Sequence, residues 1–275
     1  IRILNQALTQ EENRPIVVSV DIPSGIDATT GGVYEPAVRA DLTIPLELVK
    51  RGMFQYPARA NCGEIRVAPI GIDTSAPVEF SLIPPAAPAA LLNRAGDYHK
   101  GLAGRIYVLG GSRGMPGAPV LAALSALRAG AGLVSMAALP ASRDVQIPPE
   151  IMLDFPQSGN ARSFGLPALK SIVKKLADCD CLIVGPGIGR DASTNKLVQQ
   201  LLKWISKEDF PAVIDADALN ILSKEKKFPA LETCILTPHA GEAARLLNCS
   251  VAEVQKDRFA AVKRLHEKSG AVCLL

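Results

Sequence analysis

Short apolar runs alternate with helix-like segments throughout the second part of the chain. Strand-forming runs occupy residues 105–110, 133–137, 181–184, 212–215 and 235–236, and helical spacing of apolar residues marks 118–129, 166–176, 193–206 and 242–247. A strand, a helix and a further strand make up the unit from which parallel sheets are built. The alternation therefore predicts an α/β fold with a largely parallel sheet.

The first part of the chain carries three further strand candidates and ends in a proline-rich segment. Residues 16–21, 40–45 and 63–70 are rich in β-branched and apolar residues. Four prolines then fall within residues 77–88, a density that fits neither a helix nor a central strand. We therefore expect a first domain over residues 1–73, a linker over 74–92 and a second domain over 93–275.

Composition argues against several classes of protein. Hydrophobic residues make up 48% of the chain, which is enough to bury a core, and the net charge of +3 comes from scattered Lys and Arg. We therefore expect no nucleic-acid partner. No apolar run reaches the roughly 20 residues of a membrane span, so we expect no membrane partner. The six cysteines form no CxxC pair and predict free thiols in a reducing, cytoplasmic location.

Both ends of the chain indicate a piece of a longer protein. The first residue is Ile1 rather than Met, and no signal-peptide pattern follows it. The final residues, 271–275, form an apolar run typical of a strand interrupted at its middle. We therefore expect a polypeptide truncated at both ends.

Two glycine-rich loops follow predicted strands. The first, GGSRGMPGA (110–118), leads into a helix whose N-terminus favours anions, and the second is GPGIGR (185–190). Their turn positions are Gly111, Gly114, Gly187 and Gly189. Glycine lets the backbone approach a ligand closely, but it also serves plain turns that need positive φ. Both interpretations remain open for each loop.

Acidic residues and one histidine follow other strands of the second part. Asp215 and Asp217 are spaced by one residue and can bind a metal or a hydroxyl, or Asp217 can cap the helix that follows. His239 lies in a strand-to-helix loop, where it can contact a ligand or play a structural role. His99 and His266 are interpreted as structural or surface residues.

In the first part, Asp21, Ser24 and Asp27 surround one turn. Asp21 can receive a proton or bind a sugar hydroxyl, and Ser24 can cap the turn or offer its oxygen to a cation. An Asx-type turn that only stabilises the loop is the alternative.

The order of these motifs resembles one enzyme family far more specifically than any single motif does. VSVDIPSGID (18–27), ADLTI (40–44), KRG (50–52) and GEIRVAPIGI (63–72) resemble the C-terminal third of NAD(P)H-hydrate epimerase domains. HKGLAGRIYVLGGSRGMPGA (99–118), VGPGIGRD (184–191), VIDADALNIL (213–222) and LTPHAGEAARLL (236–247) resemble ADP-dependent (S)-NAD(P)H-hydrate dehydratase domains. The two domains are fused in this order in bifunctional NAD(P)H-hydrate repair enzymes, which the chain resembles over residues 14–73 and 94–275.

The resemblance implies repair of nicotinamide cofactors that have gained water across the ring. The expected substrates are the R and S hydrates of NADH and NADPH (NADHX and NADPHX), which are epimerised, and the S epimer is then dehydrated. ADP is the expected phosphate donor, with K+ and Mg2+ as metal cofactors; phosphorylation helps because hydroxide is a poor leaving group. The implied fold is a ribokinase-like domain, with a mostly parallel sheet and helices on both faces, preceded by part of a Rossmann-like α/β epimerase domain. Homo-oligomers are also expected.

Matched residue by residue, the resemblance implies roles for nine positions. Asp21 matches the epimerase aspartate that contacts the hydrate, and Ser24 matches its potassium ligand. The positions that match contacts to the hydrated nucleotide in the dehydratase are Ala118, Gly187 and His239. The positions assigned to the adjoining loop and nucleotide region are Gly111, Gly114, Gly189 and Asp217.

The chain departs from the family pattern at its ends. The Gly-Ser-Gly-Asp-like loop that bears the catalytic aspartate and the upstream Asn-Asn-Gly-Gly-Asp loop of the epimerase do not occur in the sequence. We therefore expect no catalytic residue within residues 1–275 and no activity of this polypeptide by itself. Two alternatives stay open: a ribokinase-like small-molecule kinase of the thiazole or hydroxymethylpyrimidine type, and a non-catalytic scaffold.

Overall fold

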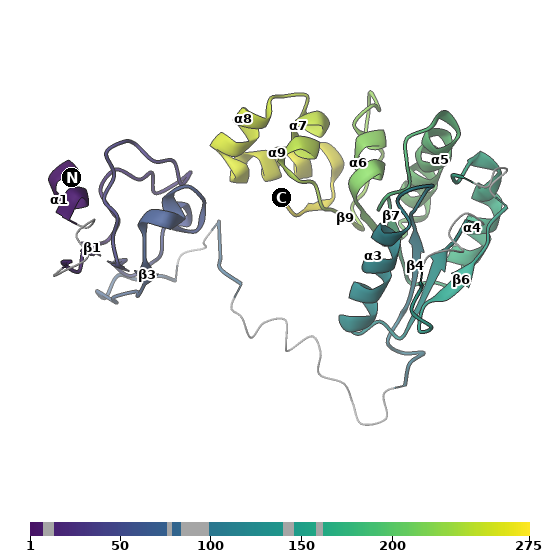
Figure 1. The fold of residues 1–275 in the computed structure, drawn as a ribbon, viewed down its shortest axis with the longest axis horizontal. Helices are drawn as coiled ribbons and strands as arrows, with labels where there is room; N and C mark the ends of the chain where they lie inside the picture. Colours follow the sequence, from purple (N-terminus) through teal and green to yellow (C-terminus); the bar gives the residue numbers. More distant parts are fainter. Residues whose placement is uncertain (8–13, 76–78, 84–98, 140–145, 158–161) are drawn as a thin grey trace. The chain divides into compact units, whose positions relative to one another are not determined.

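The computed structural model describes residues 1–7, 14–75, 79–83, 99–139, 146–157 and 162–275. The chain divides into two compact units (Figure 1): the first holds Ile1–Ala87 with Lys256–Phe259, and the second holds Pro88–Gln255 with Ala260–Leu275. Residues 76–78 and 84–92 of the predicted linker, including its four prolines, lie outside the described residues. The domain boundaries expected at residues 73 and 93 stay predictions.

A small parallel sheet in the order β1-β2-β3 forms the centre of the first unit. The unit contains α1 (Arg2–Ala7), β1 (Val18–Val20), β2 (Leu42–Ile44), η1 (Arg51–Phe54), η2 (Ala58–Asn61) and β3 (Glu64–Ile65), where η denotes a 3₁₀ turn. The three predicted strands all form, but each is shorter than predicted. The last one stops at Ile65, and an isolated bridge between Leu46 and Ala68 follows it.

A seven-stranded sheet forms the centre of the second unit, and every neighbouring pair of its strands is parallel. In chain order the strands are β4 (Arg105–Leu109), β5 (Leu133–Ala137), β6 (Met152–Asp154), β7 (Cys181–Val184), β8 (Ala212–Ile214), β9 (Cys234–Leu236) and β10 (Val272–Cys273). Their spatial order is β10-β9-β8-β7-β4-β5-β6. The predicted parallel α/β fold is confirmed, and β6 is an edge strand that the sequence prediction lacked.

Helices connect the strands of this unit. They are α3 (Gly117–Arg128), α4 (Leu169–Leu176), α5 (Ala192–Glu208), α6 (Ala216–Leu222), α7 (Ala240–Leu247), α8 (Val251–Lys256) and α9 (Arg258–Ser269). The predicted helix over 166–176 begins as a 3₁₀ turn, η4 (Leu166–Ala168), which contains Pro167. The sequence prediction lacked α8 and α9.

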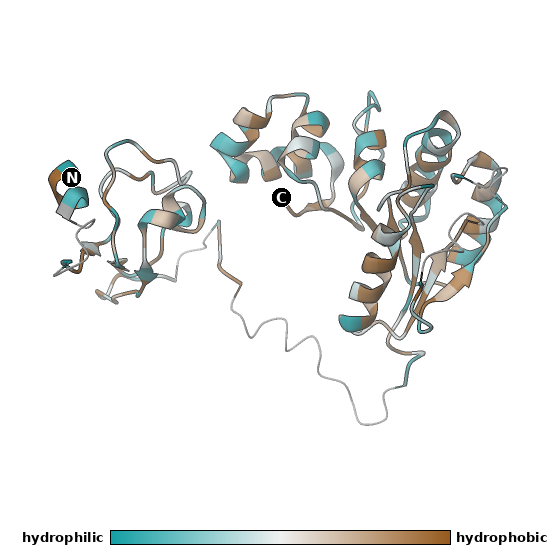
Figure 2. Cartoon of the chain, in the orientation of Figure 1, coloured by the Kyte–Doolittle hydropathy of each residue, from teal (hydrophilic) through white to brown (hydrophobic). Residues whose placement is uncertain are grey.

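Helices cover both faces of the seven-stranded sheet. Alternate residues of a strand point to opposite faces, and in β4 Tyr107 belongs to one buried cluster together with Ile172 of α4, whereas Val108 belongs to another together with Val120 of α3. Figure 2 shows hydrophobic residues along α3 and the strands beside it. Each large apolar side chain that is fully buried contributes about 1.5–3 kcal/mol, so the two layers supply the main stabilisation of this unit.

No helix among the described residues is long and apolar enough to span a membrane.

Candidate functional site

The strand order of the large sheet reverses between β4 and β7. From this boundary the chain runs outward to β5 and β6 on one side, and to β8, β9 and β10 on the other. Loops that leave the carboxyl ends of two such strands diverge, and ligands of open α/β sheets bind in the resulting crevice. The two predicted glycine loops follow β4 and β7, so both lie at this position.

The two glycine loops are joined by main-chain and side-chain hydrogen bonds. The Gly111 amide donates to the Pro186 carbonyl at 2.8 Å, and Ser112 Oγ donates to the Gly187 carbonyl at 2.9 Å. A Cβ on Gly187 would lie 2.9 Å from the Met115 carbonyl oxygen. The close approach and the positive φ of Gly187 (62°) require glycine here, so the tight-turn interpretation of this loop is confirmed.

Ala118 and Gly187, predicted to contact the same ligand, come together at the join of these loops. A Cβ on Gly187 would lie 3.4 Å from the Ala118 Cβ. The two predicted turn glycines of the first loop also adopt positive φ, with Gly111 at 82° and Gly114 at 89°. A ligand role for these four positions stays a prediction, but the fold brings Gly111, Ala118 and Gly187 into one small region.

The first turn of α3 is open to a ligand. Pro116 occupies its N-cap and makes no side-chain capping hydrogen bond. A Cβ on Gly114 or Gly117 would meet nothing within 4 Å, so space surrounds the loop. Uncapped amides at a helix N-terminus favour an anionic group, and here Gly117 and Ala118 supply such amides, whereas Pro119 has no amide hydrogen.

Asp217 holds the second glycine loop instead of capping α6. Its Oδ2 accepts a hydrogen bond from the Gly189 amide at 3.1 Å, and its Oδ1 lies 3.2 Å from Arg190 Nε. The N-cap position of α6 belongs to Asp215, whose side chain makes no capping bond and instead accepts from Thr237 Oγ1 at 2.8 Å. The capping alternative for Asp217 is therefore wrong. Within the described residues, no group of three or more His, Cys, Asp or Glu could hold a metal ion.

His239 is the N-cap of α7 and forms a capping box with Glu242. Its Nδ1 accepts from the amides of Gly241 (3.0 Å) and Glu242 (3.4 Å), and a Glu242 oxygen accepts from the His239 amide at 3.1 Å. The structural interpretation of His239 is thus confirmed. Its side chain is nevertheless 67% exposed, which leaves the outer edge of the ring available to a ligand.

In the first unit, Asp21 directly follows β1 and has a left-handed backbone (φ 63°). Its carboxylate accepts hydrogen bonds from the Lys50 ammonium and from the Leu46 amide (3.1 Å). The bond from Lys50, followed by that from Leu46, holds the pKa of Asp21 below its ordinary value. Asp21 is therefore ionised near neutral pH and acts as an acceptor toward any ligand.

The turn that follows contains the predicted Asx turn, but the aspartate responsible for it is Asp27. Its Oδ1 accepts from the amides of Thr29 (2.8 Å) and Thr30 (2.7 Å). Ser24, the expected potassium ligand, has an exposed side chain, and its carbonyl accepts from the Val38 amide at 2.8 Å. The Asx turn is therefore formed by Asp27, and the side chains of Asp21 and Ser24 take no part in it.

Sequence reasoning assigned no role to several partners of these residues. Lys50 was visible in the KRG motif, and Arg190 in the GPGIGR motif, but their partners lie 29 and 27 residues away in the chain. Ser112 stands inside the first glycine loop, where only its long-range bond to Gly187 shows its purpose. No local pattern encodes contacts of this range.

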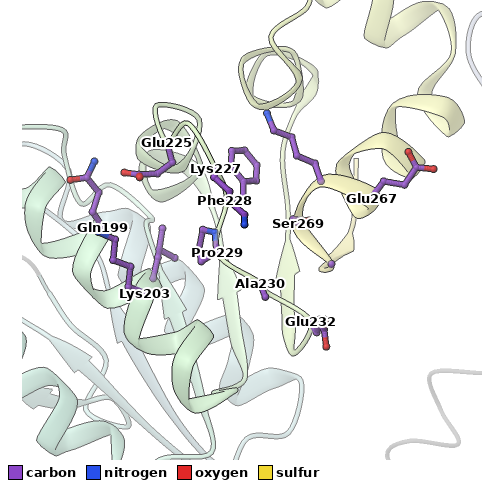
Figure 3. Close-up of a pocket in the computed structure, with 13 residues that line it drawn as sticks. Gln199, Lys203, Glu225, Lys227, Phe228, Pro229, Ala230, Glu232, Glu267 and Ser269 are labelled. Carbon is purple, nitrogen blue, oxygen red and sulfur yellow. The ribbon is translucent and has the colours of Figure 1, made fainter.

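A concavity lies at the amino ends of β9 and β10 (Figure 3). It encloses about 630 Å3 beside the segments that precede β9 and β10, with Phe228 and Ser269 among its lining residues. Lys268 is already engaged there, because its Nζ donates to the Leu246 carbonyl at 2.6 Å and lies 4.3 Å from the centre of the Phe228 ring. The amino ends of parallel strands are not where α/β sheets bind ligands, so the carboxyl ends of β4 and β7 are the better candidate position.

Comparison with known proteins agrees with the sequence motifs. The family model described as NAD(P)H-hydrate dehydratase matches residues 106–275, and that described as YjeF-related protein N-terminus matches residues 1–52. A bifunctional NAD(P)H-hydrate repair enzyme from Moorella thermoacetica is 39% identical over 94% of this chain, and one from Vibrio cholerae is 35% identical over 100% of it. The matches cover 50% and 53% of those proteins, so the chain spans about half the length of the curated relatives it matches.

A solved structure shares the fold of the second unit. A ribokinase-like superfamily protein from Enterococcus faecalis, 22% identical, matches with a TM-score of 0.55 over 66% of this chain and 61% of that chain. This likeness concerns the fold alone and confirms the expected ribokinase-like architecture. The family follows from the dehydratase match, which covers more than half of the chain. The chain thus belongs to the NAD(P)H-hydrate dehydratase family and is a homologue of the bifunctional NAD(P)H-hydrate repair enzymes, with part of the epimerase-related region at its N-terminal side.

Proposed function

We propose that the second unit binds the S epimer of hydrated NADH or NADPH in the crevice between β4 and β7, as part of an ADP-dependent dehydratase. The observation that carries the proposal is the joined pair of glycine loops at the reversal of strand order, where Ala118 and Gly187 meet. Gly111, Gly114 and Gly189 shape the loops around the ligand, and His239, at the start of α7, contacts it.

The proposed chemistry needs a phosphate donor beside the hydrated ring. Transfer of phosphate from ADP would turn the ring hydroxyl into a better leaving group. The open first turn of α3 supports an anion there, because its amides lack a side-chain cap. Both oxygens of Asp217 already face Gly189 and Arg190, so the proposal assigns Asp217 to loop support. Mg2+ would accompany the nucleotide phosphates, since the described residues contain no carboxylate cluster for it.

For the first unit, the proposal is a contribution to epimerisation of the same hydrates. Asp21 would accept a hydrogen bond from a hydroxyl of the ligand, in line with its lowered pKa. Ser24, whose side chain is exposed, would give one oxygen to K+, an assignment that rests on the sequence resemblance alone. We also propose that the protein is cytoplasmic and homo-oligomeric, and both proposals rest on the resemblance.

Binding, rather than turnover, is the measurement that tests this proposal, since the resemblance assigns no catalytic residue to residues 1–275. Calorimetric titration should show that (S)-NADPH hydrate binds and that the R hydrate binds more weakly. Ala118→Leu should abolish binding, because the larger side chain would fill the space beside Gly187. Ala252→Leu, on the exposed side of α8, is the matched control and should bind normally.

The outcome that would overturn the proposal is equally concrete. If neither hydrate binds while a thiazole or hydroxymethylpyrimidine alcohol does, the chain is a ribokinase-like small-molecule kinase domain. Equal binding by wild type and Ala118→Leu would show that the ligand sits outside the crevice between β4 and β7.

A further inference from the structure

One ring nitrogen of His239 is hydrogen-bonded to the first turn of α7, the helix that His239 caps. Its Nδ1 accepts hydrogen bonds from the amides of Gly241 and Glu242 at 3.0 and 3.4 Å. A ring nitrogen that accepts hydrogen bonds presents a lone pair and carries no hydrogen. A neutral imidazole arranged in this way therefore carries its hydrogen on Nε2, at the opposite edge of the ring.

Glu242 reinforces this arrangement from two directions. One of its oxygens accepts from the His239 amide at 3.1 Å, and the other lies 3.4 Å from Nε2. A carboxylate only accepts hydrogen bonds, so its proximity favours a hydrogen on Nε2 over a lone pair there. The two atoms, 3.4 Å apart, are not hydrogen-bonded to each other, so this hydrogen stays available to a ligand. The Glu242 side chain is 7% exposed, whereas that of His239 is 67% exposed, so the carboxylate is fixed and the ring edge faces outward.

We infer that His239 serves its ligand as a hydrogen-bond donor through Nε2, with Glu242 as the residue that positions it. The inference rests on the proposed function, in which His239 contacts the hydrated dinucleotide. The ligand atom opposite Nε2 is accordingly an acceptor oxygen. His239 is not the base that removes a proton from the ring hydroxyl, because its lone pair belongs to the cap of α7.

The chain contains its own reference for the tautomer. His266 Nδ1 lies 2.9 Å from the Ala271 carbonyl oxygen, which can only accept. His266 therefore carries its hydrogen on Nδ1, the reverse of His239. Because His239 and His266 have opposite tautomers, one spectrum of the protein allows the two Nδ1 atoms to be compared directly.

Nitrogen NMR tests the tautomer without any ligand. At mildly alkaline pH, 15N-labelled protein should show an unprotonated Nδ1 in His239, scalar-coupled to the Gly241 amide nitrogen, and a protonated Nδ1 in His266. Glu242→Ala should remove the coupling, and Glu242→Gln should preserve it, because the amide oxygen can still accept from the His239 amide. A protonated Nδ1 in His239 of the wild type would overturn the inference.

Binding measurements test the donor role separately. Asparagine is a good N-cap, so His239→Asn should keep α7 capped and unfold at nearly the wild-type denaturant concentration. It lacks a donor at the position of Nε2 and should bind (S)-NADPH hydrate about tenfold more weakly, or about 1.4 kcal/mol. His239→Ala should lose both stability and affinity. Wild-type affinity in His239→Asn would overturn the donor role.

Failure of the proposed function gives a different pattern from failure of the inference. If the wild type binds no hydrate, the proposed function falls and the donor role falls with it, whatever the NMR shows. If the hydrate binds but His239→Asn binds equally well, the proposed function stands and the inference alone is wrong.

Discussion

Asp217 accepts the amide hydrogen of Gly189 at 3.1 Å and so ties the loop after β7 to the helix that follows β8. Its other oxygen faces Arg190 of the same loop at 3.2 Å, and its side chain is 16% exposed. A largely buried carboxylate with a backbone donor and a guanidinium partner is well satisfied. Asp217 therefore braces the loop that carries Gly187 and Gly189.

Two substitutions of Asp217 should destabilise the second unit to different extents. Asp217→Asn keeps an acceptor for Gly189 but loses the ion pair with the exposed Arg190, and should lower the free energy of unfolding by up to about 1 kcal/mol. Asp217→Leu also leaves the Gly189 amide without its acceptor, and should cost about 1–3 kcal/mol. Urea denaturation measures both. Asp178→Asn, at an exposed position, is the control. An equal loss of unfolding free energy in this control would show that the contacts of Asp217 are not the cause.

Glycine substitutions should separate steric crowding from helix propensity. Gly187→Ala places a Cβ 2.9 Å from the Met115 carbonyl oxygen at a positive φ, and should cost at least about 1–2 kcal/mol of stability. Gly117→Ala meets nothing within 4 Å at the start of α3, and should stabilise by up to about 1 kcal/mol. Thermal unfolding of the two variants should therefore move in opposite directions. Equal shifts would contradict the geometry of the loop.

The N-cap of α5 should make stability depend on acid pH. Burial raises the pKa of Asp191, but hydrogen bonds from Thr194, Ser163 and Ser193 outweigh it, and the net pKa is below the ordinary value of 3.8. A pKa lowered by folding stabilises the protein above the unfolded value, and this stabilisation is lost as pH falls through the folded value. Wild-type stability should therefore decline below about pH 4 in part through Asp191.

Two replacements of Asp191 separate capping from titration. Asp191→Asn keeps a good cap and should remove this component of the acid dependence while it keeps most of the stability at neutral pH. Asp191→Ala should lose about 1 kcal/mol at neutral pH, because the amides of Ser193 and Thr194 lose their acceptor. Denaturation curves at several pH values provide the measurement. An unchanged acid profile in Asp191→Asn would show that Asp191 titrates alike in the folded and unfolded chain.

Lys50 should control the ionisation of Asp21. Lys50→Gln removes the charged donor that contributes most to the lowered pKa, so the pKa of Asp21 should rise toward its ordinary value. Lys50→Arg should preserve most of the depression. Carboxyl 13C NMR during an acid titration gives both values, and identical pKa values in all three proteins would disprove the coupling.

Much of the fold could be predicted from local pattern, whereas the partners within the site could not. The strand at 181–184 follows from a short continuous apolar run, and the helix at 193–206 follows from the helical spacing of its apolar residues, because both must face a core. β6 has no such signal, since a three-residue edge strand buries little. The glycine loops were visible as motifs, and their order matched the family. Their joining was not visible, because the Gly111–Pro186 bond links residues that only the parallel pairing of β4 and β7 brings together.

The bond between the Gly111 amide and the Pro186 carbonyl is made by the main chain alone. Any substitution that preserves the backbone path leaves this bond intact, so this part of the join between the two glycine loops does not depend on side chains. Side chains around the two glycine loops can then change one at a time during evolution, while this main-chain link between the loops is kept. A scaffold of this kind is evolvable: it allows related domains to keep one architecture while they diverge in the molecules that they accept.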